Sequence, residues 1–157
     1  MTATKVIGES VKQTNRTFIK SYVEDYAKAI TENYRRYHLN TLNGNLHGNY
    51  PEYAREQLDA IENGTANLMK FKVYTGKRYY KIVQQEFETW EKSRNYGKYA
   101  DGSVHCFVDK ETGDVYKPAS WAAPAKHIRF TFQNVDHLKF LLNPKNVGWA
   151  GGYLYMR

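Results

Sequence analysis

The chain has 157 residues, of which 41% are hydrophobic and 25% are charged, and these proportions are ordinary for a globular protein. No apolar run approaches the ~20 residues that a membrane-spanning helix needs, and the N-terminus lacks the apolar core of a signal peptide. Cys106 is the only cysteine, which excludes an intrachain disulfide and a cysteine-based metal cluster. We therefore expect a single domain over residues 1–157, in a protein made in a cytosol.

Two features depart from an average composition. The chain has 23 Lys and Arg against 16 Asp and Glu, a formal net charge of +7, and its 14 Tyr, 7 Phe and 3 Trp make it 15% aromatic. Basic charge favours polyanionic partners, and tyrosine combines a large contact area with a polar hydroxyl. A tyrosine-lined core under a lysine-rich surface has the same composition, so composition alone leaves both interpretations open.

The first part of the chain predicts two helices. Apolar and aromatic residues recur three or four positions apart over residues 14–40, namely Ile19, Val23, Tyr26, Ile30, Tyr34 and Tyr37. Asn40 and Gly44 are typical of a chain that leaves a helix. Pro51–Glu62 should form the second helix, with proline in its first turn and Gly64 after its end.

The period of the pattern then changes from helix to strand. Leu68–Tyr74 and Lys77–Val83 alternate in the manner of strands, and Thr75 and Gly76 suit a two-residue turn between them. Residues 86–93 could form a helix or continue the second strand, and we favour the strand. These residues therefore predict a first β-hairpin.

A second hairpin is predicted further along the chain. Val104–Val108 is β-branched and aromatic, and a turn-forming stretch precedes the return strand. Pairing Val108 with Val115 and Phe107 with Tyr116 makes the hairpin apolar on both faces, which suits strands covered on both sides. We therefore expect this hairpin at the centre of the scaffold.

Three shorter elements are expected in the last part of the chain. His127–Phe132 resembles a strand, Asp136–Leu142 a short helix with Asn134 as its cap, and Gly151–Met156 a closing strand. Helices followed by mostly antiparallel strands indicate an α+β fold. The expected architecture is two N-terminal helices packed on an antiparallel sheet built from hairpins, with a short helix near the C-terminus.

The first hairpin is the candidate binding surface. With a two-residue turn, Tyr74 opposes Lys77 and Lys70 opposes Lys81, and side chains alternate between two faces. One face is apolar, and the other is basic and tyrosine-rich, carrying Lys70, Lys72, Tyr74, Lys77, Tyr79 and Lys81. Lysines contact phosphates and tyrosines stack on exposed bases, so this face predicts nucleic-acid binding. The alternative is an edge hairpin that lysines protect against sheet-to-sheet aggregation.

Motifs for catalysis and metal binding do not emerge from the sequence. The histidines lack the spacing of paired metal ligands, and the acids Asp109, Glu111 and Asp114 lack the spacing of a calcium-binding loop. His105 and Cys106 are neighbours in a predicted strand and should point to opposite faces, which argues against a nucleophile–base pair. We therefore assign no catalytic residue, no metal ligand and no cofactor.

Trp121 stands among small residues and prolines in Lys117–Lys126. We expect an extended segment that lies over the sheet and is anchored by Trp121. A tryptophan at the centre of a partner-binding surface is the alternative, so Trp121 is also a candidate partner-binding residue.

The segment from Asp109 to Lys126 resembles a recurrent segment of small uncharacterised proteins of tailed bacteriophages. The likeness lies in Gly113–Val115, in Lys117–Trp121 and in Ala123–Lys126, which together read Gly-Asp-Val-x-Lys-Pro-Ala-Ser-Trp-x-Ala-Pro-Ala-Lys. The resemblance implies a viral protein made in a bacterial cytosol. It brings no activity and no catalytic residues.

Three hypotheses of different classes follow. The first is a small non-enzymatic phage accessory protein that binds DNA or RNA through the first hairpin. The second is a protein-interaction or virion-associated protein that contacts a host or capsid partner, and it predicts an exposed apolar patch with Trp or Tyr at its centre. The third is an enzyme whose site is not visible in linear motifs. The expected location is the bacterial cytosol of the host, or the virion.

Overall fold

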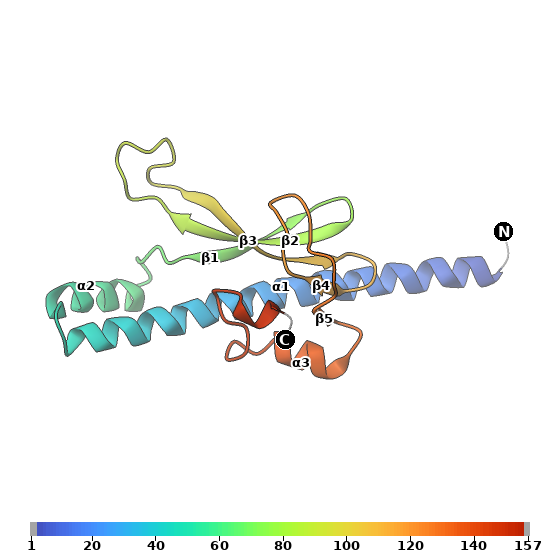
Figure 1. Cartoon of the computed structure of the whole chain (residues 1–157), viewed down its shortest axis with the longest axis horizontal. Coiled ribbons are helices and arrows are strands. Elements are labelled where there is room, and N and C mark those ends of the chain that lie inside the picture. Colours follow the sequence, from blue (N-terminus) through green and yellow to red (C-terminus); the bar gives the residue numbers. More distant parts are fainter. Residues whose placement is uncertain (1–2, 156–157) are drawn as a thin grey trace.

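A long helix, α1 (Ala3–Leu46), forms the base on which the other elements are assembled (Figure 1). The computed structural model describes the backbone of residues 3–155 and the side chains of residues 17–155. A second helix, α2 (Pro51–Glu62), folds back beside the end of α1. A five-stranded antiparallel sheet covers the middle of α1, and the C-terminal part of the chain returns alongside it.

The helix α1 is longer than the sequence predicted at both ends. The predicted start near residue 14 was wrong, since α1 begins at Ala3. The predicted stop at Asn40 and Gly44 was also wrong, because the helix passes through both and ends at Leu46. Leu42 is buried, so continuing the helix to place its side chain offsets the cost of about 1 kcal/mol for an interior glycine. The second helix has the bounds that the sequence predicted.

The sheet has the strand order β1-β2-β3-β4-β5, and every neighbouring pair is antiparallel. Its strands are β1 (Lys70–Thr75), β2 (Tyr79–Phe87), β3 (Tyr99–Asp109), β4 (Asp114–Tyr116) and β5 (Phe130–Thr131). The predicted second hairpin is confirmed in its register, with Val108 opposite Val115 and Phe107 opposite Tyr116. Its longer strand, β3, is the middle strand of the sheet, as its two apolar faces predicted.

The later elements follow the sequence less closely. A short helix, α3 (Val135–Leu141), is confirmed together with its cap, because the Asn134 side chain accepts hydrogen bonds from the backbone of the first turn. Of the predicted strand His127–Phe132, only Phe130–Thr131 forms a strand, β5. The predicted closing strand is wrong: Gly152–Leu154 forms a 3-10 turn, η1, entered through a left-handed Gly151 with φ of 82°. Met156 lies outside the described residues.

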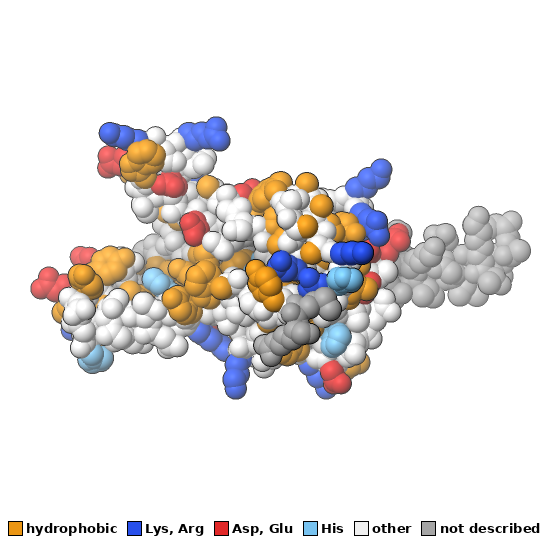
Figure 2. All heavy atoms as spheres, viewed as in Figure 1, with side chains coloured by type: hydrophobic (Ala, Val, Ile, Leu, Met, Phe, Trp, Pro, Cys, Tyr) orange, Lys and Arg blue, Asp and Glu red, His pale blue; other side chains and the backbone are white. Residues whose placement is uncertain are grey.

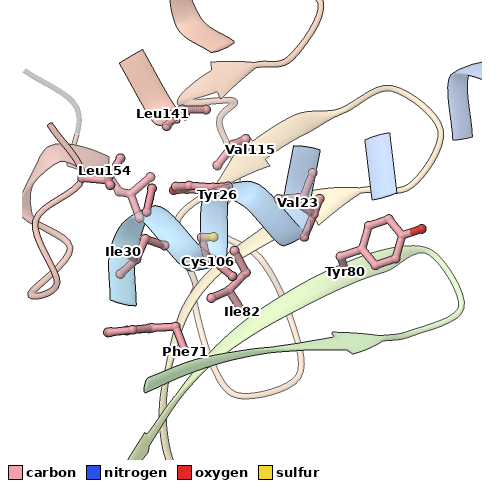
Figure 3. Packing of buried hydrophobic residues seen from close by; sticks show 14 of the residues in the cluster. Val23, Tyr26, Ile30, Phe71, Tyr80, Ile82, Cys106, Val115, Leu141 and Leu154 are labelled. Atoms are coloured by element: carbon pink, nitrogen blue, oxygen red, sulfur yellow. The ribbon is translucent and has the colours of Figure 1, made fainter. Parts of the chain in front are cut away.

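The main core lies between α1 and the sheet. Val23, Tyr26 and Ile30 of α1 are fully buried against Ile82 of β2 and Val108 of β3. Figure 3 shows strand, helix and C-terminal side chains converging on the same space, with Leu141 and Leu154 on the side opposite β1 and β2. The structure thus confirms an α+β fold in which helices pack on an antiparallel sheet.

The C-terminal segment is tied to α1 by the half-buried side-chain amide of Asn33. Asn33 donates from Nδ2 to the carbonyl of Pro144 at 2.7 Å, and its Oδ1 accepts from the backbone N–H of Trp149 at 2.9 Å. A side-chain amide can satisfy one donor and one acceptor of an irregular backbone in this way. The segment after α3 therefore lies along α1 without forming a strand.

An irregularity in β3 changes where two side chains point. Ile82 faces Cys106 and Val83 faces Val104, so His105 is an extra residue with no partner across the ladder. The expectation that His105 and Cys106 point to opposite faces was wrong. The ring of His105 contacts Phe71 at 5.2 Å between centroids, on the side of the sheet where Cys106 joins the main core.

Candidate nucleic-acid interface

The two faces of the first hairpin are separated as the sequence predicted, although the register differs. Tyr74 opposes Lys81, not Lys77, and Lys70 opposes Gln85, not Lys81. The loop is longer than a two-residue turn, and the resulting shift moves each partner by an even number of positions. An even shift keeps every side chain on its face, whereas a shift of one would have exchanged the faces.

We call the side of the sheet that packs on α1 the inner face and the opposite side the outer face. Phe71, Val73, Tyr80 and Ile82 belong to the inner face and its core. Lys70, Lys72, Tyr74 and Lys81 lie on the outer face, where they were predicted to lie together. The partner strand adds Tyr99, Asp101 and Phe107 to the outer face.

Lysines of the outer face lie over aromatic rings. The Nζ atom of Lys70 is 4.0 Å from the ring centroid of Tyr99, and that of Lys72 is 4.8 Å from the ring of Tyr74. The Nζ atom of Lys81 is 4.1 Å from the ring of Trp121. A cation over an aromatic ring contributes about 0.5–1 kcal/mol at an exposed site, so the rings hold these charges in place while Lys70 and Lys72 remain exposed.

The carboxylate of Asp101 organises the middle of the outer face. It accepts a hydrogen bond from the Gln85 amide at 2.8 Å and from the Tyr74 hydroxyl at 2.8 Å. The pKa of Asp101 is lowered, first by the Gln85 hydrogen bond. Desolvation opposes this shift, and the Tyr74 hydrogen bond and the nearby charges of Lys72 and Lys81 lower the pKa further. The hydrogen bond to Asp101 is also the main reason why the pKa of Tyr74 is raised. The carboxylate of Asp101 therefore stays ionised, and its hydrogen-bond partners are the uncharged side chains of Gln85 and Tyr74.

Tyr79 has a packing role on the outer face. Its ring lies edge-on to Phe107 at 5.8 Å and to Tyr116 at 6.0 Å, and these rings cover a small second core. That second core consists of Val83, Val104 and Phe107. Tyr79 therefore helps to form the surface on which the lysines lie, and its half-buried ring packs against its neighbours there.

Lys77 lies in the loop between β1 and β2, apart from the other five predicted residues. With Arg78 and Lys110 it lines an open hollow of about 780 Å³ beside the turn between β3 and β4. Asp109 lies at the same hollow, and its Oδ2 is 3.8 Å from Nε of Arg78. The hollow has three cations against two acids, Asp109 and Glu111, so Lys77 adds to a weakly positive surface around the hairpin tip.

The segment 117–126, which we call the strap, crosses over the sheet as predicted. A bridge between Pro118 and Pro124 closes it into a loop, visible above β2 and β3 in Figure 1. Lys81 donates from Nζ to the carbonyl of Trp121 at 2.9 Å, and the Trp121 side chain is 48% exposed. Trp121 thus anchors the strap through its backbone and its lysine contact while half of its side chain remains accessible.

The histidine and the cysteine are connected through two tyrosines. Nε2 of His105 is 2.7 Å from the Tyr153 hydroxyl, which is 2.5 Å from the Tyr26 hydroxyl, and Tyr26 is hydrogen-bonded to the thiol of Cys106. Burial lowers the pKa of His105 to about 4 and raises the pKa of Cys106 to about 12. The imidazole is therefore neutral and the thiol protonated near pH 7, an arrangement that suits a structural link better than a nucleophile and its base.

A cleft of about 380 Å³ opens above His105, between the root of the strap and the C-terminal segment. Gln84, Ser103 and Lys117 line it together with backbone of the C-terminal turn. Among the residues that the structure describes, no group of three or more His, Cys, Asp or Glu side chains is arranged to hold a metal ion. Within the same residues, no helix is long and apolar enough to cross a membrane.

Sequence reasoning missed the loop between β2 and β3. Residues 88–98, which we call the finger, stand away from the rest of the chain in Figure 1. Trp90 and Tyr96 are exposed there, and Figure 2 shows hydrophobic side chains at its end with Lys or Arg on both sides and acidic side chains beside them. The available signal was an aromatic and basic stretch between two strands, which the strand interpretation of residues 86–93 concealed.

One of three comparisons with known proteins finds a relationship. No curated protein and no solved structure matches the chain. A protein family matches it over residues 6–156, which is nearly its whole length. The chain therefore belongs to the family described as the family of unknown function DUF7717.

Proposed function

We propose that this chain is a small non-enzymatic accessory protein of a tailed bacteriophage and that it binds nucleic acid through the outer face of its sheet. It acts in the bacterial cytosol, or travels in the virion. The phage origin rests on the likeness of the segment between Asp109 and Lys126 to phage proteins. The nucleic-acid ligand rests on the chemistry of the outer face.

The observation that carries the proposal is the alternation of cations and rings on β1, β2 and the strap. Lys70, Lys72 and Lys81 each lie within 4.8 Å of an aromatic centroid, which fixes their positions at the surface. A charge that is held in place loses little side-chain freedom when a phosphate binds. A formal net charge of +7 adds a long-range attraction for a polyanion.

The proposal predicts the salt dependence of binding. If three or four lysines contact phosphates, the logarithm of the binding constant should fall with the logarithm of salt concentration with a slope of roughly −2 to −3 for a single strand. Fluorescence anisotropy of a labelled 20-nucleotide strand, measured between low and physiological salt, gives this slope. An absence of binding to single- and double-stranded DNA and RNA at low salt would defeat the proposal.

A charge reversal locates the surface. Lys70→Glu/Lys72→Glu changes two exposed side chains of the edge strand β1, and it should weaken binding at least tenfold because each reversal removes an attraction and adds a repulsion. The matched control is Lys20→Glu/Lys145→Glu, which lowers the net charge equally at exposed sites on α1 and after α3. Equal losses in the two variants would mean that net charge alone attracts the ligand, against a site on the outer face.

A second candidate function is favoured by an aromatic patch at the α1–α2 end. Tyr37 is 52% exposed and Tyr53 is 56% exposed, and Tyr37 lies 5.3 Å from the half-buried ring of Trp149. Tyr34 packs on the same tryptophan at 5.4 Å. Figure 2 shows hydrophobic side chains gathered over this part of the molecule. Exposed Tyr and Trp clusters are typical of protein-binding surfaces, so the patch suits a host or capsid protein.

This candidate is tested by removing the patch without touching the sheet. In affinity purification, a capsid or host protein should co-purify with the wild type and with Lys70→Glu/Lys72→Glu. It should be lost from Tyr37→Asp/Tyr53→Asp. The reason is that a buried carboxylate opposes the burial of the patch. Identical sets of retained proteins from all three chains would count against a partner at this patch.

A further inference from the structure

The finger between β2 and β3 is held rigid by its own hydrogen bonds. The backbone N–H of Glu88 donates to the carbonyl of Lys98 at 2.9 Å, and that of Gly97 donates back to the carbonyl of Glu88 at 3.0 Å. Inside this closure, Ser93 donates to the carbonyl of Trp90 at 3.0 Å. The carboxylate of Glu88 also accepts the N–H of Trp90 at 2.8 Å. A loop bonded in this way is organised before any ligand arrives.

This rigid loop presents two large rings to solvent. The side chain of Trp90 is 63% exposed and that of Tyr96 is 52% exposed. Leaving that much aromatic surface in water forgoes about 1–2 kcal/mol of burial per ring. An ordered loop that leaves its aromatic rings exposed to solvent is suited to a contact with another molecule.

The charges of the finger favour an anionic contact. Lys92, Arg94 and Lys98 are exposed beside the two rings. The loop also contains two acids: Glu88, whose carboxylate accepts the backbone N–H of Trp90, and the exposed Glu91, so three cations against two acids leave the finger with a formal charge of +1. Cations next to exposed rings match a strand of nucleotides, in which each base carries a phosphate.

The finger is continuous with the outer face. Phe87 and Tyr99 are the last pair of the β2–β3 ladder before the finger, and their rings lie edge to face at 5.4 Å. Tyr99 is the ring under Lys70, at 4.0 Å from its Nζ. The rings and cations of the outer face therefore lead to the base of the finger without a break in the sheet.

We propose that the ligand is a single-stranded nucleic acid and that the finger selects it. Unpaired bases stack on Trp90 and Tyr96 while the lysines of the outer face contact the phosphates. This inference rests on the proposed function, and it names the ligand class. In a duplex the base faces are already stacked on one another, so exposed rings gain little there, whereas each base stacked on a protein ring contributes about 1–3 kcal/mol. The finger therefore selects single strands, and the lysines alone cannot make that distinction.

The test uses the full chain, a labelled 20-nucleotide single strand and the matching duplex, with binding measured by anisotropy. Trp90→Ala should weaken binding of the single strand about tenfold and leave the weaker duplex binding unchanged. Tyr96→Ala should act in the same direction. Tyr50→Ala is the matched control, because Tyr50 is 65% exposed and its side chain makes no hydrogen bond at the start of α2. A second readout is quenching of tryptophan fluorescence by the single strand, which Trp90→Ala should reduce, with Trp121 on the outer face providing the remaining quenching.

The outcomes separate the two proposals. If the wild type binds neither nucleic acid, the proposed function fails. If the wild type binds single strands and Trp90→Ala binds them equally well, this inference is overturned and the finger is left for a protein partner. Equal loss of single-strand and duplex binding in Trp90→Ala would also overturn it, because the finger would then not select single strands.

Discussion

The inner and outer faces of one sheet are stabilised in different ways. The inner face is filled by α1 and the C-terminal segment, and its residues are almost entirely excluded from water. The outer face has a small second core of three buried residues, covered by tyrosines and by lysines that lie over rings. The same strands thus provide a rigid scaffold on one side and an accessible, cationic surface on the other. Substitutions on the two faces should therefore affect different properties: stability on the inner face and binding on the outer face.

The largest effect on stability is expected from the inner face. Ile82→Ala removes a fully buried side chain between α1 and the sheet and should lower the free energy of unfolding by about 3 kcal/mol through lost burial and a residual cavity. Urea denaturation followed by circular dichroism measures this loss. A loss below about 1 kcal/mol would mean that the sheet and α1 are not held by this contact.

The buried His105 should make the inner face sensitive to acid. Its folded-state pKa of about 4 lies below the unfolded value of about 6.5, so the unfolded chain binds the proton first as the pH falls. This contribution is complete above pH 6.5 and is lost between pH 6.5 and 4, by up to about 3 kcal/mol. The stability difference between the wild type and His105→Asn should shrink over that range. A difference that is constant with pH would contradict the neutral buried imidazole.

The turn that leads into β4 should tolerate no side chain at Gly113. Its φ is 74°, and an added Cβ would lie 3.0 Å from the Cβ of Phe132, so Gly113→Ala should cost about 2 kcal/mol. Gly64→Ala is the matched control, because Gly64 has the same φ but open space around it. Thermal unfolding should show the larger loss for Gly113→Ala, and equal losses would exclude the contact with Phe132 as a cause.

The smallest effect on stability is expected from the lysines of the outer face. Lys70→Ala/Lys72→Ala removes two exposed cations from rings and should change the free energy of unfolding by less than about 1 kcal/mol, while it weakens nucleic-acid binding severalfold. Urea denaturation and anisotropy on the same preparation separate the two effects. A large loss of stability with unchanged binding would make these lysines part of the scaffold.

The sequence predicted the fold class and the separation of the hairpin faces because both depend on alternation, which an even change of register leaves intact. It predicted the pairing of Val108 with Val115 because the two strands are apolar on both faces. The same local signals gave a wrong helix end at Gly44, because α1 continues to Leu46 and buries Leu42. They also misled at Gly151, where a left-handed turn replaces a strand.

The candidate site was predicted only in part for the same reason. Lys70, Lys72, Tyr74 and Lys81 share the outer face because alternation places them there. The packing of Tyr79 on Phe107 and the lysine contact of Trp121 depend on residues brought together from distant parts of the chain. The orientation of His105 depends on one extra residue in β3, which leaves no mark in the alternation.

The most direct measurement is a nuclear magnetic resonance titration of the labelled chain with a 20-nucleotide single strand. The account predicts that shifts gather on the outer face and the finger, at the backbone amides of β1, the adjoining part of β3 and residues 88–98. The amides of α3, of the buried middle of α1 and of the α1–α2 aromatic patch should stay unshifted. Shifts gathered at Tyr37 and Tyr53, or an unchanged spectrum at saturating strand, would contradict the claim that the outer face is the binding surface.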